Sequence, residues 1–420
     1  MNWKSKAAGG LALAAAAALL AACGSTPAAN GGGGGGSSSS KSPIIVGELF
    51  PMTGREPFVG QWFLHGAKAG IYDVNHNGGV MGHPLQAVLA DTGGDPVDAV
   101  PAWRQLETHN PTFELGPSSL EIMGVIKLYD PAHLVDFMEG GTTQVDHMQY
   151  KYVWRTTPSD STMAKAMAYY ALQKHYTRAA FLFESTSNAQ TLVPPLIDAY
   201  TRHGGTVVAN IQLVPHQSSY RSEVLQAFQN HPDCVFIQTD PQTASTLFAN
   251  IKQLGDLNVP FIGTDAGATI EFAKAMGLSD ASRWLVGMAG APPSGPAWSH
   301  YVQVYQKVWG SNQPVELSQN TYDAVIIAAL AMTAAHSTDP KVWVNDITKV
   351  SNPPGVPVYT YAQGVKELQA GKKINYEGAT GPDDFNQYHN VFGGWDVAQF
   401  DTSGNLHPVF HVTAQDIQNF

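Results

Sequence analysis

Short segments rich in hydroxyl groups and glycine follow two apolar runs of this sequence. Gly116-Pro117-Ser118-Ser119 comes after one run, and Gly140-Gly141-Thr142-Thr143 comes after the next. Hydroxyls and backbone N–H groups at the start of a helix suit a carboxylate group. The alternative is that Ser118 and Thr142 only cap a helix or a turn, as such residues often do. These segments therefore favour binding of a small polar molecule.

Catalytic signatures are absent from the sequence. There is no G-x-S-x-G elbow, no H-E-x-x-H pair and no C-x-x-C pair, so we expect neither an enzyme nor a cofactor. His407 and His411 have a spacing that would suit a metal on a helix. They lie in a strand-like run that contains Pro408, so we expect no metal site.

A cysteine at the end of the first apolar run has a distinct chemistry. Lys4 and Lys6 precede the apolar residues 11–20, and small residues lead to Cys23, which is the layout of a secretory signal. The segment Leu20-Ala21-Ala22-Cys23 resembles a bacterial lipoprotein box, which implies lipidation of the Cys23 thiol after removal of residues 1–22. A plain secretory signal is the alternative. The prediction is a lipid-anchored protein at the extracytoplasmic side of the cell membrane.

Residues 23–42 form the next segment, which contains six consecutive glycines and four consecutive serines. This composition has no apolar surface to bury, so the segment is predicted to be a disordered tether. No strand precedes the glycines and no Lys-Ser or Lys-Thr pair follows them directly, which excludes a phosphate-binding loop.

Charge and cysteine content restrict the partners. The formal net charge is −11, and removal of Lys4 and Lys6 would make the protein more acidic, so nucleic acid is not an expected partner. Cys234 is the remaining cysteine, so the mature body cannot form an internal disulfide. Cys234 lies in an apolar run and is predicted to be a buried small hydrophobe. No later run is long enough to span a membrane.

The body alternates strand-like runs with amphipathic stretches, which is typical of βα units around a parallel sheet. Predicted strands of the first series are residues 44–50, 85–90, 112–115, 134–138 and 152–156, with helices at 61–75 and from 95 onward. A second series has predicted strands at 179–184, 206–213, 234–238, 260–263 and 285–289, and helices at 160–175, 190–203, 220–230 and 242–254. Helices at 298–309, 321–336, 341–350 and 362–370 follow, then strands at 395–400 and 408–412. The length exceeds one ordinary core, which indicates two domains.

The order of many short motifs resembles the type I periplasmic solute-binding proteins of the leucine/isoleucine/valine-binding kind. The matching segments are Thr53-Gly54, Gly60, His65-Gly66-Ala67, Asp73-Val74-Asn75, Gly78-Gly79-Val80-Met81-Gly82, Asp91 with Asp95-Pro96, Gly116 to Ser119, Arg155-Thr156-Thr157-Pro158-Ser159-Asp160, Pro260-Phe261-Ile262-Gly263-Thr264-Asp265, and Tyr376 to Pro382 with Phe385. Each motif is weak alone, but together they cover nearly the whole body.

This resemblance implies an α/β fold of two doubly wound Rossmann-like lobes joined by a three-segment hinge. Lobe 1 is expected at residues 43–157 plus 292–385, and lobe 2 at 158–291 plus 386–420. The ligand is expected where the carboxyl ends of the strands face each other, and it closes the lobes like a hinge.

The resemblance also implies which residues bind the ligand. Ser118, Ser119, Gly140, Gly141 and Thr142 match the carboxylate-binding loops of the family. Asp265 matches the acidic position that takes the ammonium, although it is equally placed to cap a helix near Thr269.

Two positions depart from the family pattern. Ser187-Asn188 stands where relatives often have a tyrosine and a glycine, and Asp240 stands where an aromatic residue often follows the strand. The pocket is therefore predicted to be more polar than a branched-chain site, with Asn188 and Asp240 as candidate contacts. Asp240 is as well placed to cap the helix after Pro241. Phe58 and Val59, in the first predicted loop, are candidates for the apolar wall.

These expectations define a function. The sequence predicts a monomeric extracytoplasmic lipoprotein that captures a small polar solute, most plainly an amino acid, and delivers it to an ABC permease in the membrane. The alternatives are a ligand-sensing receptor of the same fold, or a binder of amides or urea.

Overall fold

A computed structural model of the protein describes residues 41–290 and 294–420, apart from the side chains of Ser187 and Asn188. The predicted signal segment, Cys23 and most of the tether lie outside the described residues. Within the described part of the chain, no helix is both long and apolar enough to cross a membrane.

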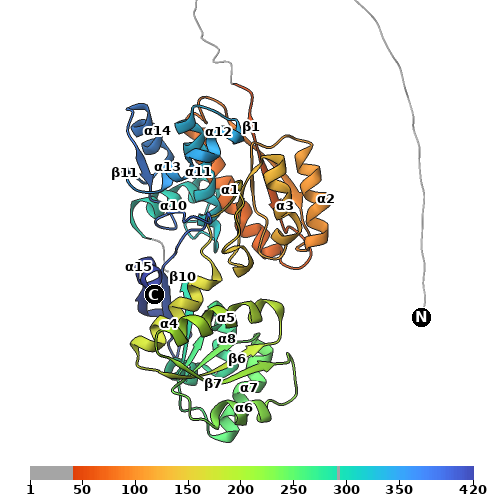
Figure 1. Cartoon of the computed structure of the whole chain (residues 1–420), viewed down its shortest axis with the longest axis vertical. Helices are drawn as coiled ribbons and strands as arrows, with labels where there is room; N and C mark the ends of the chain where they lie inside the picture. Colours follow the sequence, from red (N-terminus) through yellow and green to blue (C-terminus); the bar gives the residue numbers. More distant parts are fainter. Residues whose placement is uncertain (1–40, 291–293) are drawn as a thin grey trace, which may run out of the picture. The chain divides into compact units, whose positions relative to one another are not determined.

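A five-stranded parallel sheet forms the first layer of the body (Figure 1). Its strands, in spatial order, are β2 (Leu85–Asp91), β1 (Ile44–Phe50), β3 (Phe113–Leu115), β4 (Val135–Met138) and β5 (Val153–Arg155). The chain places β2 on one side of β1 and the strands from β3 onward on its other side. The loops after β1 and β3 therefore diverge and leave the strand ends accessible, as in other doubly wound sheets.

A seven-stranded sheet forms the core of the second half. In spatial order its strands are β14 (Leu406–Val412), β13 (Trp395–Phe400), β10 (Leu285–Gly290), β9 (Phe261–Gly263), β8 (Cys234–Gln238), β6 (Arg178–Glu184) and β7 (Thr206–Leu213). The strands from β10 to β7 are parallel, whereas β13 and β14 run antiparallel to their neighbours. Alternate residues pack into cores on opposite faces: Phe236 belongs to one and Ile237 to the other.

Helices cover both sheets. Those that pack with the five-stranded sheet are α1 (Pro57–His76), α2 (Pro96–Glu107), α3 (Ile122–Ala132), α10 (Gly295–Trp309), α11 (Ser318–Ala335), α12 (Pro340–Trp343), α13 (Ile347–Ser351) and α14 (Tyr361–Gln369). Those of the second half are α4 (Asp160–Gln173), α5 (Ser187–Arg202), α6 (Arg221–Phe228), α7 (Pro241–Leu254), α8 (Ile270–Met276), α9 (Leu278–Trp284) and α15 (Ala414–Asn419). We call each sheet with its helices a lobe: lobe 1 holds the five-stranded sheet and lobe 2 the seven-stranded sheet.

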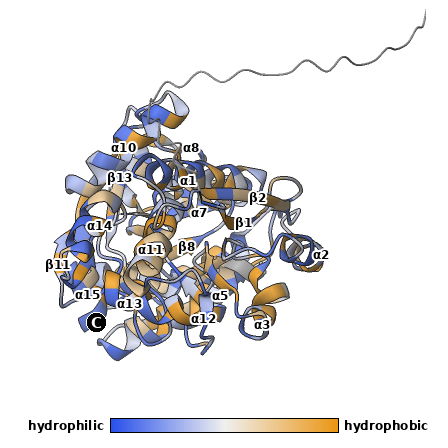
Figure 2. Cartoon of the chain, turned by 90° about the horizontal axis from the view of Figure 1, so that it is seen from above, coloured by the Kyte–Doolittle hydropathy of each residue, from blue (hydrophilic) through white to orange (hydrophobic). Residues whose placement is uncertain are grey.

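Glycines let α1 and α11 pack at close range. A Cβ at Gly66 would lie 2.0 Å from the Ser318 carbonyl oxygen, and a Cβ at Gly70 would lie 2.7 Å from the Val325 Cβ. Helix α11 is buried along almost its whole length, and its apolar character can be followed in the hydropathy colouring of Figure 2. A helix that is apolar all round belongs in a core rather than at a surface.

The chain passes between the two sheets after β5, after β10 and after β12 (Ile374–Tyr376), which pairs with β11 (Val356–Val358) in a small parallel ladder. The first and third passages contact each other, because the Arg155 N–H donates to the His389 carbonyl oxygen over 3.0 Å. The Asn320 side chain, from α11, also donates to the Thr156 carbonyl oxygen over 2.9 Å.

Most predicted strands and helices are confirmed, but two expectations are wrong. Helix α1 begins at Pro57 rather than at Gln61, because proline at the first helical position starts a helix without losing a hydrogen bond. Phe58 and Val59 therefore lie on a helix, not in a loop. The single helix predicted over residues 341–350 is divided among α12, a 3-10 turn η3 (Val344–Asp346) and α13. The small ladder of β11 and β12 was not predicted.

Cys234 is fully buried in β8, as its apolar neighbours predicted, and burial raises the pKa of its thiol. His407 and His411 lie on β14, where His407 contacts Asp401 and His411 contacts Asp396. In the described ranges, no cluster of three or more potential ligands suits a metal ion.

Candidate ligand-binding site

Ser118 lies between two acidic side chains at the end of β3. Its hydroxyl is buried and makes short contacts with a carboxyl oxygen of Glu56 and with one of Glu121. The other carboxyl oxygen of Glu121 accepts from the Thr92 hydroxyl over 2.7 Å. A hydroxyl has one proton to donate, so it can serve as donor to one of the two carboxyl groups at a time. Ser118 thus joins the loops that follow β1, β2 and β3.

The charge state of Glu56 fits this arrangement. Burial raises the pKa of Glu56, the hydrogen bond from Ser118 opposes that rise, and the negative charge of Glu121 adds to it. The Ser118 hydroxyl is therefore occupied by acidic partners, and it is not free to bind a ligand carboxylate.

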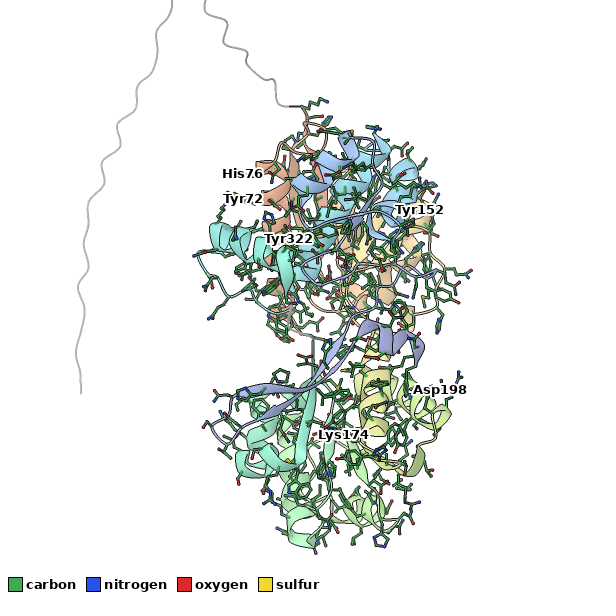
Figure 3. All side chains as sticks on the ribbon, turned by 90° about the vertical axis from the view of Figure 1, so that its left-hand side faces the viewer. Tyr72, His76, Tyr152, Lys174, Asp198 and Tyr322 are labelled. Carbon is green, nitrogen blue, oxygen red and sulfur yellow. The ribbon has the colours of Figure 1, made fainter. Side chains whose placement is uncertain are left out.

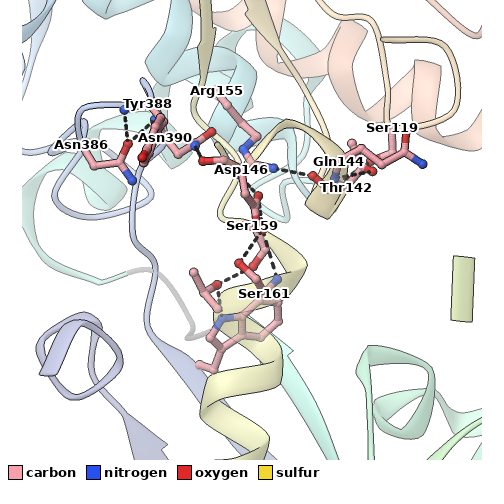
Figure 4. A network of polar contacts seen from close by, with 12 residues as sticks. Ser119, Thr142, Gln144, Asp146, Arg155, Ser159, Ser161, Asn386, Tyr388 and Asn390 are labelled. Carbon is pink, nitrogen blue, oxygen red and sulfur yellow. Dashed lines mark hydrogen bonds and ion pairs between the residues drawn. The ribbon is translucent and has the colours of Figure 1, made fainter. Parts of the chain in front are cut away.

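Ser119 and Thr142 are differently placed. The Thr142 N–H donates to the Ser119 Oγ over 3.1 Å, and the Gln144 N–H donates to the Thr142 Oγ1 over 3.4 Å (Figure 4). Both hydroxyls act as acceptors in these bonds, and neither donates its proton to another of the residues that the structure describes. A Cβ at Gly140 would lie 2.3 Å from the Ser119 Oγ, so glycine is needed for this approach. Two hydroxyl protons thus remain available to a ligand.

Asp160, the first residue of α4, lies against Gly141. Its N–H donates to the Gly141 carbonyl oxygen over 2.7 Å. A Cβ at Gly141 would lie 2.1 Å from the Asp160 Oδ1, so the carboxylate occupies the place of a side chain at residue 141. Burial raises the pKa of Asp160 to about 7, the negative charge of Asp265 adds to the rise, and Arg155 opposes it.

The buried cation beside this region is held through both of its terminal nitrogens. The Arg155 side chain is 1% exposed, and its Nη2 lies 2.7 Å from the Asp146 Oδ1. Its Nη1 donates to the Thr142 carbonyl oxygen over 2.9 Å, and the Ser159 hydroxyl donates to the same Asp146 oxygen over 2.6 Å. Figure 4 shows this network, in which Asn390 also donates to the Asp146 carbonyl oxygen over 3.0 Å. Arg155 holds the loops in place, and Asp146 neutralises its charge.

Asp265 is exposed at the end of β9. It begins the 3-10 turn η2 (Asp265–Ala268), and its Oδ1 accepts from the Ala266 N–H over 2.9 Å. Helix α8 is capped by Thr269, whose hydroxyl accepts from the Phe272 N–H, so Asp265 does not cap that helix. Its charge also acts on lobe 1, because burial raises the pKa of Glu316 and the negative charge of Asp265 raises it further.

Asp240 is engaged within lobe 2. Its Oδ1 accepts from the Thr243 N–H over 2.8 Å and caps α7, and its Oδ2 lies 2.5 Å from the His216 Nε2. Burial raises the pKa of Asp240, but the hydrogen bond from the Thr243 N–H and the contact with His216 outweigh burial, so the pKa is lowered. Of the two alternatives in the sequence, the structure therefore shows the cap.

The two apolar candidates lie on the first turn of α1. Phe58 is 55% exposed and contacts Trp62 edge to face, with ring centroids 5.2 Å apart. Val59 is partly buried against the core of lobe 1. Asn188 lies on α5, and its side chain is outside what the structure describes.

A family model described as "Periplasmic binding protein" matches residues 43–405 of this chain. The chain belongs to the periplasmic binding protein family. Its fold is the type I periplasmic binding protein fold, with two α/β lobes, and membership implies an extracytoplasmic location.

Individual relatives are distant in sequence and close in fold. A "Chemotactic signal transduction system substrate-binding protein BasB" of Halobacterium salinarum is 22% identical over 86% of this chain and 88% of its own length. A "Leu/Ile/Val-binding protein BraC3" of Rhizobium johnstonii is 23% identical over 60% of this chain and 66% of its own length. Among solved structures, an ABC transporter substrate-binding protein from Sphaerobacter thermophilus has a TM-score of 0.71 at 17% identity, covering 90% of this chain and 100% of its own.

This periplasmic binding protein has residues at its strand ends that sequence reasoning missed. Glu56, Glu121, Asp160 and Thr264 were not candidates, although all four lie next to residues that were. Asp160 and Thr264 stood inside motifs that carried the resemblance, so their place after a strand was already a signal. Glu56 and Glu121 had no such signal, because their contact with Ser118 depends on how three loops meet.

Proposed function

We propose that this periplasmic binding protein captures a small polar organic solute, an amino acid or a related amine or amide, and delivers it to an ABC importer. The observation that carries the proposal is the pairing of unused hydroxyl protons on Ser119 and Thr142 with the carboxylates of Asp160 and Asp265. Hydroxyl donors without an internal acceptor, together with carboxylates that form no ion pair with the described residues, are what a solute with both kinds of group requires.

The relatives support the proposal. One solved structural neighbour is described as the branched-chain amino acid transporter substrate-binding protein LivJ from Streptococcus pneumoniae in complex with isoleucine. It has a TM-score of 0.66 at 16% identity, which carries the fold and not the ligand. We infer binding without turnover, since these relatives are named as binding proteins.

The first residues complete the proposal. We infer that residues 1–22 are a signal peptide, that the Cys23 thiol carries the lipid, and that residues 23–42 tether the body as a monomer near its permease. Lobe 1 would comprise residues 43–157 plus 292–385, and lobe 2 residues 158–291 plus 386–420, with closure on the solute. Replacement of Cys23 by serine should release the protein from the membrane fraction, which labelling with a radioactive fatty acid would also report.

A thermal-shift screen tests the solute-binding proposal. The probes are L-amino acids, short amides, urea and diamines, added to protein that has been unfolded in urea and refolded to remove any bound solute. A ligand at 100 times its dissociation constant should stabilise the fold by about 2.7 kcal/mol. Recovery of the unaltered ligand after denaturation would support binding alone, whereas conversion of the ligand would show an enzyme.

A second candidate function is sensing, and the name of one relative favours it. BasB belongs to a chemotactic signal transduction system and matches most of this chain. Deletion of the gene separates the two functions: loss of solute uptake with intact responses supports import, and loss of the response with intact uptake supports sensing.

A further inference from the structure

Two carboxylates of lobe 2 form no ion pair with any described residue. Asp160 begins α4 and Asp265 follows β9. Among the described residues, none forms a hydrogen bond or an ion pair with the Asp160 carboxylate. The guanidinium of Arg155, whose charge opposes the rise in the pKa of Asp160, is already 2.7 Å from the Asp146 Oδ1. Burial raises the pKa of Asp160, and the negative charge of Asp265 raises it further.

Buried oxygens without partners lie at the same end of the sheet. The Thr264 side chain is 0% exposed, and its Oγ1 has no hydrogen-bond partner among the described residues. The Gln238 Oε1, at the end of the neighbouring strand β8, has none either. Such atoms also occur elsewhere in the protein, and at a strand end a bound molecule can supply the missing partner.

The alternation of side chains along the strands shows where these oxygens point. Phe236 and Ile262, two residues earlier on β8 and β9, pack in one core with Met163 of α4. Side chains two residues apart lie on the same face of a sheet. Gln238 and Thr264 therefore lie on the sheet face that packs in the same core as α4, the helix that Asp160 begins.

The candidate residue Ser118 of lobe 1 is also an unfavourable partner for a ligand carboxylate. The Ser118 hydroxyl, which the family resemblance assigned to a ligand carboxylate, is held between Glu56 and Glu121. A ligand carboxylate placed there would meet two acidic side chains. Among the candidate side chains, the hydroxyls of Ser119 and Thr142 are further donors, and they are neutral.

We propose that the solute is a net organic cation, with an ammonium or guanidinium group held by Asp160 and Asp265 and by the buried oxygens of Thr264 and Gln238. This inference rests on the proposed function and names the chemical class of its solute. An ammonium has three N–H donors and a guanidinium has five. Several acceptor oxygens satisfy more of these donors than a single carboxylate could. The class includes diamines and basic amino acids, and it excludes branched-chain amino acids as the main ligand.

A proton balance accompanies this mode of binding. A cation beside Asp160 favours its charged form, so binding releases protons from the fraction of Asp160 that is protonated. The groups that face Asp160 are Asp265 from η2, Arg155 from β5 and Asp146 from the loop after η1 (Thr143–Val145). Affinity should therefore rise between pH 6 and pH 8.

Calorimetric titration of the refolded full chain tests this inference. The probes are putrescine, L-arginine, L-leucine and acetamide. Putrescine or L-arginine should bind, and Asp160→Asn and Asp265→Asn should each weaken that binding at least ten-fold. Asp198→Asn is the matched control, because Asp198 pairs with Arg202 on the exposed side of α5 (Figure 3) and should leave affinity unchanged.

The outcomes separate this inference from the proposed function. Binding of L-leucine or acetamide in preference to both cations, with no effect of Asp160→Asn, would overturn the cation assignment while leaving solute binding intact. Binding of a cation that neither Asp160→Asn nor Asp265→Asn weakens would overturn the assignment as well. If circular dichroism shows that Asp160→Asn does not fold, Thr264→Val takes its place, with the same expected loss. No binding of any amino acid, amine or amide would overturn both proposals.

Discussion

Gly141 and Asp160 meet so closely that no side chain fits between them. The Asp160 N–H donates to the Gly141 carbonyl oxygen over 2.7 Å, and a methyl group at residue 141 would lie 2.1 Å from the Asp160 Oδ1. The contact joins the loop after β4, in lobe 1, to the first turn of α4, in lobe 2. The position of the Asp160 carboxylate therefore depends on the absence of a side chain at residue 141.

Gly141→Ala should push this carboxylate aside. We expect a loss of about 1 to 3 kcal/mol in the free energy of unfolding, because crowding of a packed contact costs this much. In an Asp160→Ala background the same substitution should cost little, since the atom that the methyl group meets is gone. Urea unfolding of the four variants measures this coupling. Equal costs in both backgrounds would show that the two residues do not interact.

Ser118 and Ser119 should differ although they are adjacent. Ser118→Ala leaves Glu56 and Glu121 without the hydroxyl between them, and we expect a loss of about 1 to 3 kcal/mol in stability. Ser119→Ala removes an acceptor for one N–H in a partly exposed place and should cost less. Ligand affinity should show the opposite order, with the larger loss in Ser119→Ala, because the hydroxyl proton of Ser119 has no internal acceptor among the described residues. Equal effects on affinity in a titration would argue against this distinction.

The fold was largely predictable because local patterns and packing agree. The strand predicted at residues 206–213 is confirmed without change as β7, and glycine closes the helix that ends near residue 203. The start of α1 was missed because an aromatic and glycine-containing segment reads as a loop, although Pro57 already suited the first turn of a helix. The β11 and β12 ladder was missed because three-residue strands carry little periodicity.

The site was less predictable because it depends on which loops meet. Residue types suggested hydroxyl donors at Ser118 and Ser119, and only the structure distinguishes them, since Glu56 approaches from a loop far away in the sequence. Asp240 had an open alternative: the hydrogen bond from the Thr243 N–H shows the cap, and contact with a ligand stays a prediction. Asp160 was visible as a helix start, but its approach to Gly141 was not.

Buried carboxyl groups in lobe 1 should make stability fall as pH rises. Glu114 and Asp136 are neighbours in register on β3 and β4, and Tyr129 donates a hydrogen bond to Glu114. The pKa of Asp136 is raised by burial and by the negative charges of Glu114 and Glu139. Burial also raises the pKa of Glu114, although the hydrogen bond from Tyr129 opposes that rise. An acid whose pKa is raised by folding stays neutral in the fold but ionises near pH 4 when the chain unfolds.

The free energy of unfolding should therefore be larger at pH 5 than at pH 8, as measured by urea unfolding. Glu139 fits the same direction, since burial raises its pKa to about 8 even though hydrogen bonds from Thr157 and Thr156 lower it. Asp136→Asn cannot ionise and should reduce the difference between the two pH values, whereas the exposed Asp198→Asn should not. Stability that increases from pH 5 to pH 8 would contradict this reading of lobe 1.

The ion pair of Arg155 and Asp146 should contribute far more to the free energy of unfolding than an exposed ion pair does. Their side chains are 1% and 12% exposed, and loss of one partner leaves a buried charge uncompensated. Asp146→Ala should lower stability by about 3 to 5 kcal/mol. Asp198→Ala removes an exposed pair with the same N–O distance of 2.7 Å and should cost about 0.3 to 0.5 kcal/mol. Melting curves compare the two, and similar losses would mean that burial has no effect on the pair.

Calorimetric titration of refolded protein with the ligand from the thermal-shift screen tests solute binding at the strand ends most directly. We predict saturable binding of one ligand per chain, with at least a ten-fold loss of affinity in Asp265→Asn and no loss in Asp198→Asn. Binding of the same affinity in all three proteins, or no binding of any amino acid, amine or amide, would contradict the account.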